Sequence, residues 1–411
     1  MLPFVNMSER KRILVLTPWS YKDGLIQAYT LPYVKIISEL PFVESLWLVT
    51  DEQDSLKLTS EESRAAKDRL QELKVQWLPK SYVPFGIEAV VAKVRQLLGL
   101  IVLIRKEKVT HIHAWTTPGG VLGYCLSVIS RKPLVIDSFE PHAEAQVENG
   151  TWRRSSLGFR LLWWFEKRMA RHAQALIYTS KNMVQYARDK YDAYDEKELV
   201  KPACVDLEKF ASAPRKDGEL LQKLGLVDMV VGVYAGKLGG IYHDVELFEF
   251  AARANTFWNG RFRLLMLTTE PRDSILEFAR QANCPNEIIV SLFVDHDEIP
   301  RHMKLADFGI TLVKSVPTKK CCTPIKDGEY WASGLPIVIT ENIGDDSEIV
   351  KDQKTGFILK DFDRESMERC FNEAEHLIAN EEIHDRCELV AMKYRPFEIA
   401  NHVYNAIYKS L

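Results

Sequence analysis

The chain has 411 residues, more than one hydrophobic core usually accommodates, so two domains of ordinary size are expected. Hydrophobic residues make up 46% and charged residues 27%, which is typical of globular proteins and excludes fibrous and intrinsically disordered classes. The formal net charge of −3 excludes a strongly basic nucleic-acid-binding protein, although residues 1–200 carry a net charge of +5 and residues 201–411 a net charge of −8.

Short apolar or β-branched runs alternate with longer amphipathic segments along the chain, a pattern typical of βαβ units with parallel strands. In the first half, this pattern predicts strands at residues 13–17, 45–49, 75–78, 110–114, 134–137 and 175–179. A connector follows, and the pattern then restarts with predicted strands at residues 229–234, 262–267, 287–292, 308–313 and 336–340. We therefore expect an α/β protein with two doubly wound sheets and a boundary near Asp206, and a functional cleft between the two domains.

Cysteine usage and hydropathy indicate the compartment. The seven cysteines form no CxxC pair, so we expect reduced thiols and neither disulfides nor a structural zinc site. The N-terminus lacks the apolar core of a signal peptide, and the most apolar run, residues 97–104, is far shorter than the roughly 20 residues needed to cross a bilayer. The sequence predicts a cytoplasmic protein.

The segment from Cys322 to Ile339 is the most informative one. Thr323 and Pro324 are suited to the N-cap and first position of a helix that ends at Gly334. A helix N-terminus binds phosphate groups, and a lysine in its first turn adds charge. Glu329 could accept two hydrogen bonds from ribose hydroxyls, although a solvated helix residue is an equally good interpretation. The candidate donor-binding residues here are Thr323, Pro324, Ile325, Lys326 and Glu329.

A second candidate phosphate site follows the predicted strand at residues 229–234. Gly236 and Gly239 would let backbone amides approach a phosphate, and Lys237 and His243 would neutralise a diphosphate leaving group before a helix that begins near Asp244. The segment lacks the full spacing of a dinucleotide fingerprint, so a structural turn is an equally good interpretation of this pattern taken alone.

Together these motifs resemble the GT-B-fold retaining glycosyltransferases of family four, also called glycosyl transferases group 1. Five segments match the family's motifs in the family's order. They are Pro202–Asp206 with Phe210, Ala235–Leu238, Ala306–Asp307, Glu329 with Ala332–Val338, and Gly344 with Glu348–Val350 and Gly356.

The resemblance implies that residues 1–205 bind the acceptor and residues 206–393 bind a nucleotide-sugar donor, with the helix at 394–411 packing back on the first domain. It also implies that Glu329 holds the ribose and Lys237 faces the diphosphate. The chain departs from the family pattern at Cys321, where the family has an acid, at Lys237, where it has arginine, and at His243, where it has lysine. Lys326 is a candidate to restore the missing charge.

In the first domain, residues 137–142 follow a buried strand, and their polar groups are expected to emerge at the sheet edge. His142 and Glu140 are the candidate catalytic residues. Gly24 and Gln27, in a loop after the first strand, and His113 are expected on the acceptor side. His111 and His113 share a strand face, but two ligands do not make a metal site, so no metal requirement is predicted.

Residues 153–171 contain six basic residues and one acid among large apolar side chains. This pattern is typical of a helix at a membrane interface and also of a helix that packs on a sheet. The same two interpretations apply to residues 90–108, and we expect ordinary burial for both segments.

The sequence thus predicts a metal-independent retaining glycosyltransferase that needs no cofactor beyond its nucleotide-diphosphate sugar. Its acceptor would be a hydroxyl of a glycan, a lipid-linked saccharide or another envelope precursor, with peripheral attachment to the inner face of a membrane as an open alternative and no nucleic-acid partner. A nucleotide-sugar epimerase of the same fold and a catalytically silent nucleotide-sugar-binding subunit are the competing hypotheses.

Overall fold

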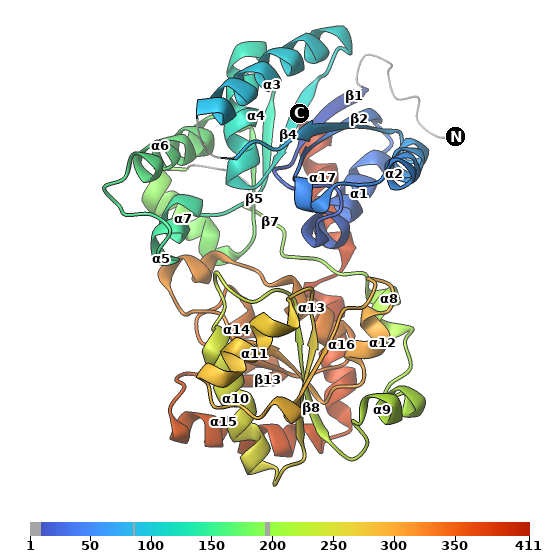
Figure 1. Cartoon of the computed structure of the whole chain (residues 1–411). Coiled ribbons are helices and arrows are strands. Elements are labelled where there is room, and N and C mark those ends of the chain that lie inside the picture. Colours follow the sequence, from blue (N-terminus) through green and yellow to red (C-terminus); the bar gives the residue numbers. More distant parts are fainter. Residues whose placement is uncertain (1–9, 85–86, 194–197) are drawn as a thin grey trace. The chain divides into compact units, whose positions relative to one another are not determined.

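The structure is a computed structural model, and it describes residues 10–84, 87–193 and 198–411 (Figure 1). The chain divides into two compact units. The first unit comprises Met1–Lys201 together with Glu398–Leu411, and the second comprises Pro202–Phe397. Each unit contains its own parallel sheet.

Among the described residues, the first unit contains a seven-stranded parallel sheet with the order β3-β2-β1-β4-β5-β6-β7. Its strands are β1 (Lys11–Leu16), β2 (Val43–Glu52), β3 (Val75–Ser81), β4 (His111–Trp115), β5 (Leu134–Phe139), β6 (Ala175–Tyr178) and β7 (Leu199–Val200). Every residue of β4 and β5 is buried, as expected for central strands of a parallel sheet that is covered on both faces.

Helices cover the two faces of this sheet (Figure 1). They are α1 (Leu31–Glu39), α2 (Ser60–Glu72), α3 (Ile87–Lys106), α4 (Thr116–Ser130), α5 (His142–Glu148), α6 (Leu157–His172), α7 (Lys181–Tyr191) and α17 (Phe397–Ser410). The last of these comes from the far end of the chain, and its Tyr404 hydroxyl donates a 2.6 Å hydrogen bond to Asp137 Oδ2 on β5. The C-terminal helix is therefore part of the first unit's core.

Among the described residues, the second unit contains a six-stranded parallel sheet with the order β10-β9-β8-β11-β12-β13. Its strands are β8 (Val230–Ala235), β9 (Phe262–Leu267), β10 (Ile289–Leu292), β11 (Phe308–Thr311), β12 (Ile337–Thr340) and β13 (Gly356–Leu359). Its helices are α8 (Leu207–Ala211), α9 (Gly218–Leu224), α10 (Asp244–Phe257), α11 (Arg272–Gln281), α12 (Ile299–Met303), α13 (Ile325–Ala332), α14 (Asp346–Gln353), α15 (Arg364–Ile378) and α16 (Glu382–Tyr394).

The strands of the second unit alternate their side chains between two cores. On β8, Val231 and Val233 contribute to the core that contains Tyr330 and Trp331, whereas Tyr234 contributes to the core that contains Trp258. This alternation follows from the two-residue period of a strand. Because both faces of the sheet are covered, polar groups become accessible mainly where the strands end.

The predicted strands all occur, with small shifts at their ends, and the α/β class is confirmed. The prediction missed β7 and β13, which have only two and four residues. The helix predicted from Tyr394 is wrong at its start, because Tyr394 ends α16 and Pro396 separates it from α17. The loop predicted around Gly24 is shorter than expected, because Gly24 already lies in a helical turn that leads into a π-helix at Ile26–Thr30.

The burial expected for the basic, aromatic segment is only partly correct. On α6, Glu166, Met169 and Ala170 are buried, whereas Leu157 is 81% exposed and Leu161 is 59% exposed. Across the described residues, no helix combines the length and apolar character required of a membrane span.

Candidate functional site

The glycine-rich loop after β8 has the backbone geometry of a close-approach site. Gly236, Gly239 and Gly240 adopt φ values of +125°, +89° and +64°, a region that side chains disfavour. A Cβ added to Gly239 or Gly240 would meet no atom within 4 Å. At Gly236, it would meet only Lys326, with Nζ at 3.4 Å. The loop thus leaves open space beside its backbone, and Lys326 lies at the edge of that space.

Tyr330 on α13 fixes this helix against the end of β8. Its hydroxyl accepts a 2.9 Å hydrogen bond from the amide of Ala235, the last residue of β8. Its ring packs so tightly against Gly309 on β11 that a Cβ at this position would lie 2.3 Å from ring atoms. The absence of a side chain at position 309 therefore allows α13 to begin beside the glycine-rich loop.

Lys326, in the first turn of α13, is 7% exposed. Its Nζ lies 4.0 Å from the ring centroid of Tyr234 and 4.1 Å from that of Tyr242. Among the described residues, Nζ has no hydrogen-bond partner. Burial lowers the pKa of Lys326 to about 7, although the neighbouring carboxylates of Asp327 and Glu329 act in the opposite direction. A buried ammonium group held by two aromatic rings is suited to bind an anion at this place.

Glu329 lies one turn after Lys326 on α13 and is half-buried. Burial raises the pKa of Glu329 to about 7, while Lys326 and Lys209 act to lower it. The side chain thus retains some exposure and has two cationic neighbours. It could accept hydrogen bonds from a pair of hydroxyl groups, as predicted from the sequence.

Thr323 and Pro324 precede α13 but do not cap it in the predicted way. The helix begins at Ile325, with Pro324 at the N-cap position and no side-chain cap. The Thr323 hydroxyl instead accepts hydrogen bonds from the amide of Ala203 at 3.2 Å and from Arg395 Nη1 at 2.5 Å. No side chain caps the helix, and the Asp327 amide donates a 3.3 Å hydrogen bond to the carbonyl of Pro324, so the amides of Ile325 and Lys326 are the ones available to a ligand.

Arg395, near the C-terminal end of the second unit, contacts residues near the N-terminal end of the same unit. Its guanidinium contacts the carbonyl of Ala203 at 3.4 Å and forms a buried ion pair with Asp346. Val205 also donates a 2.8 Å backbone hydrogen bond to the carbonyl of Arg395. Nearby, burial raises the pKa of Asp327, which accepts a 2.5 Å hydrogen bond from the Thr311 hydroxyl. Sequence reasoning missed Arg395 and Asp346, because no local pattern indicates such distant partners.

Lys237 and His243, the two side chains predicted to neutralise the diphosphate, have different surroundings. Lys237 is exposed. His243 directly precedes α10, with Nδ1 3.3 Å from Glu246 Oε1 and its ring 4.5 Å from that of Phe362. Cys321, at the position of the family's acid, is 2% exposed at the end of a 3₁₀ turn.

In the first unit, the expectation that residues 137–142 all emerge at the sheet edge is wrong for Asp137 and Ser138. Both are buried, and Ser138 adopts a left-handed φ of +53°, which coincides with a register shift between β5 and β6. Glu140 and His142 are half-buried. His142 begins α5, with Nε2 3.2 Å from Gln146 Nε2.

The structure places His113 in the core rather than on an acceptor-binding surface. It has no exposed surface, and its Nδ1 lies 2.6 Å from the Tyr408 hydroxyl on α17. Burial also lowers the pKa of His113. Gly24 is exposed, and the Gln27 amide donates a 2.6 Å hydrogen bond to the carbonyl of Tyr21. Among the described residues, no three His, Cys, Asp or Glu side chains are grouped so that they could hold a metal ion.

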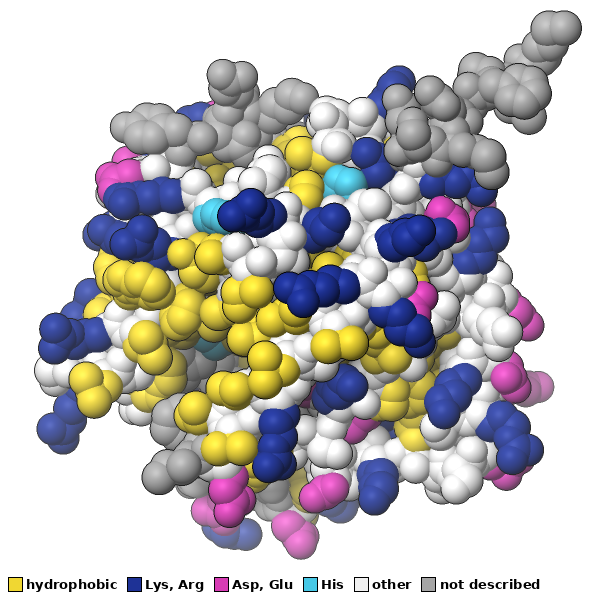
Figure 2. Space-filling view, turned by 90° about the horizontal axis from the view of Figure 1, so that it is seen from above, with side chains coloured by type: hydrophobic (Ala, Val, Ile, Leu, Met, Phe, Trp, Pro, Cys, Tyr) yellow, Lys and Arg dark blue, Asp and Glu magenta, His cyan; other side chains and the backbone are white. Residues whose placement is uncertain are grey.

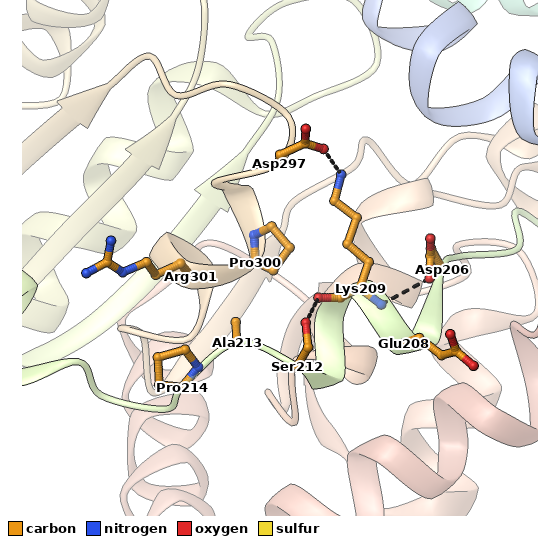
Figure 3. A pocket seen from close by; sticks show the side chains of 9 residues that line it. All are labelled: Asp206, Glu208, Lys209, Ser212, Ala213, Pro214, Asp297, Pro300 and Arg301. Atoms are coloured by element: carbon orange, nitrogen blue, oxygen red, sulfur yellow. Dashed lines mark hydrogen bonds and ion pairs between the residues drawn. The ribbon is translucent and has the colours of Figure 1, made fainter. Parts of the chain in front are cut away.

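A separate cavity of about 630 Å³ lies between α8 and α12 in the second unit (Figure 3). The two basic side chains on its wall already have carboxylate partners. Lys209 Nζ lies 2.8 Å from Asp297 Oδ1, and Arg301 Nη2 lies 2.7 Å from Asp217 Oδ2. Lys209 and Arg301 therefore differ from Lys326, whose Nζ has no hydrogen-bond partner among the described residues.

Comparison with known proteins gives a family match for part of the chain. Residues 48–204 match the model of the glycosyl transferase 4-like domain. No curated protein matches the chain.

Solved structures match nearly the whole chain. Sucrose-phosphate synthase from Thermosynechococcus elongatus is 13% identical, with a TM-score of 0.73 over 98% of this chain and 99% of its own. Anabaena Alr3699/HepE, solved in complex with UDP-glucose, is 18% identical, with a TM-score of 0.70 over 97% and 100%. WaaG, a glycosyltransferase involved in lipopolysaccharide biosynthesis, is 11% identical, with a TM-score of 0.70 over 96% and 99%. The GT-B fold and the resemblance to its glycosyltransferases are thus confirmed.

Proposed function

Because the chain has the GT-B fold and carries a glycosyl transferase 4-like domain, we propose that it is a retaining glycosyltransferase that uses a nucleotide-diphosphate sugar. The sugar would be transferred to a hydroxyl of a glycan, a lipid-linked saccharide or another envelope precursor. We propose that the donor is the only co-substrate and that no cofactor or metal ion is required.

The unpaired ammonium of Lys326 is the observation that carries this proposal. It is buried beside Gly236 and lies in the first turn of α13, where main-chain amides are uncapped. Burying an ammonium without an anionic partner is unfavourable, so the site is more favourable with an anion bound. A diphosphate between the glycine-rich loop and α13 would contact the ammonium and the helix amides together.

We also propose roles for the other donor-site residues. Lys237, which is exposed on the loop, would place a second positive charge beside the diphosphate. Glu329 would accept hydrogen bonds from the ribose hydroxyls. HepE was solved with UDP-glucose, which supports a nucleotide-sugar donor for a chain of this fold.

In the proposed reaction, the bond between the anomeric carbon and the diphosphate oxygen breaks, and a bond from the acceptor oxygen forms on the same face. The proton of the acceptor hydroxyl passes to the departing diphosphate. Negative charge develops on the departing diphosphate, so positive groups fixed before the reaction stabilise this transition state. Lys326, Lys237 and the α13 amides supply them. We propose His142 and Glu140 of the first unit as the residues that contact the sugar or the acceptor hydroxyl; His113 is not included because it is buried.

Binding of nucleoside diphosphates tests the donor site directly. We expect at least one of UDP, GDP and ADP to raise the melting temperature, and Lys326→Met to lower its affinity by about tenfold or more, since a charge-assisted contact is removed. Isothermal titration calorimetry measures the affinity. Lys351→Met, at an exposed lysine on α14, is the matched control and should bind as the wild type does.

Activity assays separate the alternatives. Transfer of the sugar with retained anomeric configuration is expected when a suitable acceptor is present. Conversion of the donor sugar without acceptor would identify an epimerase, and nucleotide binding without transfer or donor hydrolysis would identify a silent binding subunit. Equal affinity of wild type and Lys326→Met would contradict the assignment of the donor site.

A further inference from the structure

Three neighbouring helices of the first unit expose hydrophobic side chains. Helix α4 packs against both α3 and α6, so the three form one continuous layer. Of the sixteen large hydrophobic side chains that are exposed among the described residues, ten lie on these helices. They are Val90, Val91, Val94, Leu98 and Val102 on α3, Val128 and Ile129 on α4, and Leu157, Leu161 and Trp164 on α6. We call this surface the α3–α4–α6 face.

The spacing of these residues gives α3 and α6 an apolar stripe each. On α3, Val91, Leu98 and Val102 recur at intervals of seven and four residues, and on α6, Leu157, Leu161 and Trp164 recur at intervals of four and three. Such intervals place side chains on one side of a helix. The exposed fractions run from 45% to 81%, so these stripes do not contribute fully to the core of the unit. A patch of this extent is uncommon on a protein surface without a partner.

Basic side chains lie within and beside the same stripes. Arg95 is exposed between Val91 and Leu98, and Arg168 lies 5.2 Å from the Trp164 ring. Arg95, Arg105, Arg131, Arg160 and Arg168 form no ion pair with other side chains in the described part of the chain. Figure 2 shows Lys and Arg side chains distributed among and around hydrophobic ones on the face seen from above.

Acidic side chains are nearly absent from these helices. Helix α3 has Glu88 in its first turn, α4 has no acid, and the one acid of α6, Glu166, has no exposed surface. Glu166 instead accepts a 2.8 Å hydrogen bond from the amide of Ala143, at the start of α5. The surface is therefore both apolar and positively charged.

We propose that the α3–α4–α6 face docks onto an anionic lipid bilayer. Exposed Leu, Val and Trp side chains would enter the headgroup region, and the arginines would pair with anionic phosphates. Charge complementarity favours this partner over a second copy of the chain. A dimer formed through this face would bring the unpaired arginines of both copies together, and like charges repel. The proposal goes beyond the proposed function and does not depend on it.

Vesicle flotation tests the docking surface with the full-length chain. We expect the wild type to float with vesicles of phosphatidylcholine and phosphatidylglycerol, and much less with vesicles of phosphatidylcholine alone. Raising the salt concentration should release it, since the ionic part of the contact is screened. The double variant Leu98→Asp, Leu161→Asp and the triple variant Arg95→Glu, Arg160→Glu, Arg168→Glu should each lower the bound fraction at least about tenfold.

A matched control distinguishes a specific face from general hydrophobicity. Leu389 on α16 of the second unit is 61% exposed, against 59% for Leu98 and Leu161, so Leu389→Asp should float as the wild type does. All variants alter exposed side chains, and unchanged circular dichroism verifies their folding. The proposal is overturned if the wild type does not bind anionic vesicles, or if Leu389→Asp releases it as effectively. It is also overturned if light scattering shows a dimer that Leu98→Asp dissociates while vesicles remain unbound.

Discussion

At the scale of single residues, the environment of Lys326 differs from that of an ordinary surface lysine. Its ammonium is buried against two tyrosine rings, and burial lowers its pKa to about 7. Glu329 is affected in the opposite direction, since burial raises its pKa to about 7. A bound diphosphate would favour the charged form of the lysine, because the anion offsets the cost of burying that charge.

This environment predicts a pH dependence of nucleotide binding. The lysine is charged below its pKa and loses its proton as the pH rises through about 7. The wild type should therefore lose about five- to tenfold in affinity for its nucleoside diphosphate, relative to Lys326→Arg, between pH 6.5 and 8.5. Arginine remains charged over this range, so the variant corrects for ionisation of the ligand. Calorimetry at several pH values measures the ratio, and a ratio independent of pH would contradict the prediction.

At the scale of elements, Tyr330 holds α13 against the sheet. Tyr330 lies directly over Gly309 of β11, and its hydroxyl accepts a hydrogen bond from the amide at the end of β8. This contact aligns the first turn of the helix with the glycine-rich loop. The position of the candidate site therefore depends on the packing of Tyr330 against the sheet.

Gly309→Ala should disturb this alignment. Its Cβ would lie 2.3 Å from the Tyr330 ring, so the helix must shift. We expect a loss of about 1–3 kcal/mol in the free energy of unfolding together with weaker nucleotide binding. Urea denaturation and calorimetry measure the two effects.

Gly218→Ala is the control for this substitution. Position 218 begins α9, and a Cβ there would have no atom within 4 Å. We expect its stability to change by less than about 0.5 kcal/mol. Equal stability of the two variants would show that the Tyr330 contact does not position α13.

At the scale of the whole molecule, residues from distant parts of the chain meet around Asp137 in the first unit. Lys201 Nζ lies 3.2 Å from its Oδ1, and the Tyr404 hydroxyl donates to its Oδ2. Burial alone would raise the pKa of Asp137, but Lys201, His113 and Tyr404 outweigh it and lower the pKa to about 2. The C-terminal helix is thereby tied to the central strand β5.

Asp137→Asn should destabilise the first unit by about 3–5 kcal/mol, because Lys201 would stay buried without its carboxylate. The folded pKa lies below the unfolded value of about 3.9, so the stabilising effect is present above pH 4 and is lost as the pH falls toward 2. Urea denaturation at neutral and acidic pH measures this difference. Glu39→Gln, which removes an exposed ion pair with Lys35, should change stability by less than about 1 kcal/mol. A loss as large for Glu39→Gln would contradict the argument.

Local sequence patterns predicted all strands except β7 and β13, the glycine-rich loop and a helix start one residue before that of α13, because periodicity, glycine and proline act on neighbouring residues. They also indicated Lys326 and Glu329, because both residues lie in the first turns of a helix whose start is marked by a nearby proline. Tertiary structure decided which charges are buried and unpaired. Asp137, His113 and Arg395 acquire their environments from partners up to 295 residues away, and the exposure of Leu161 depends on which helices cover α6. Burial and long-range pairing are properties of the packed chain, and no local pattern encodes them.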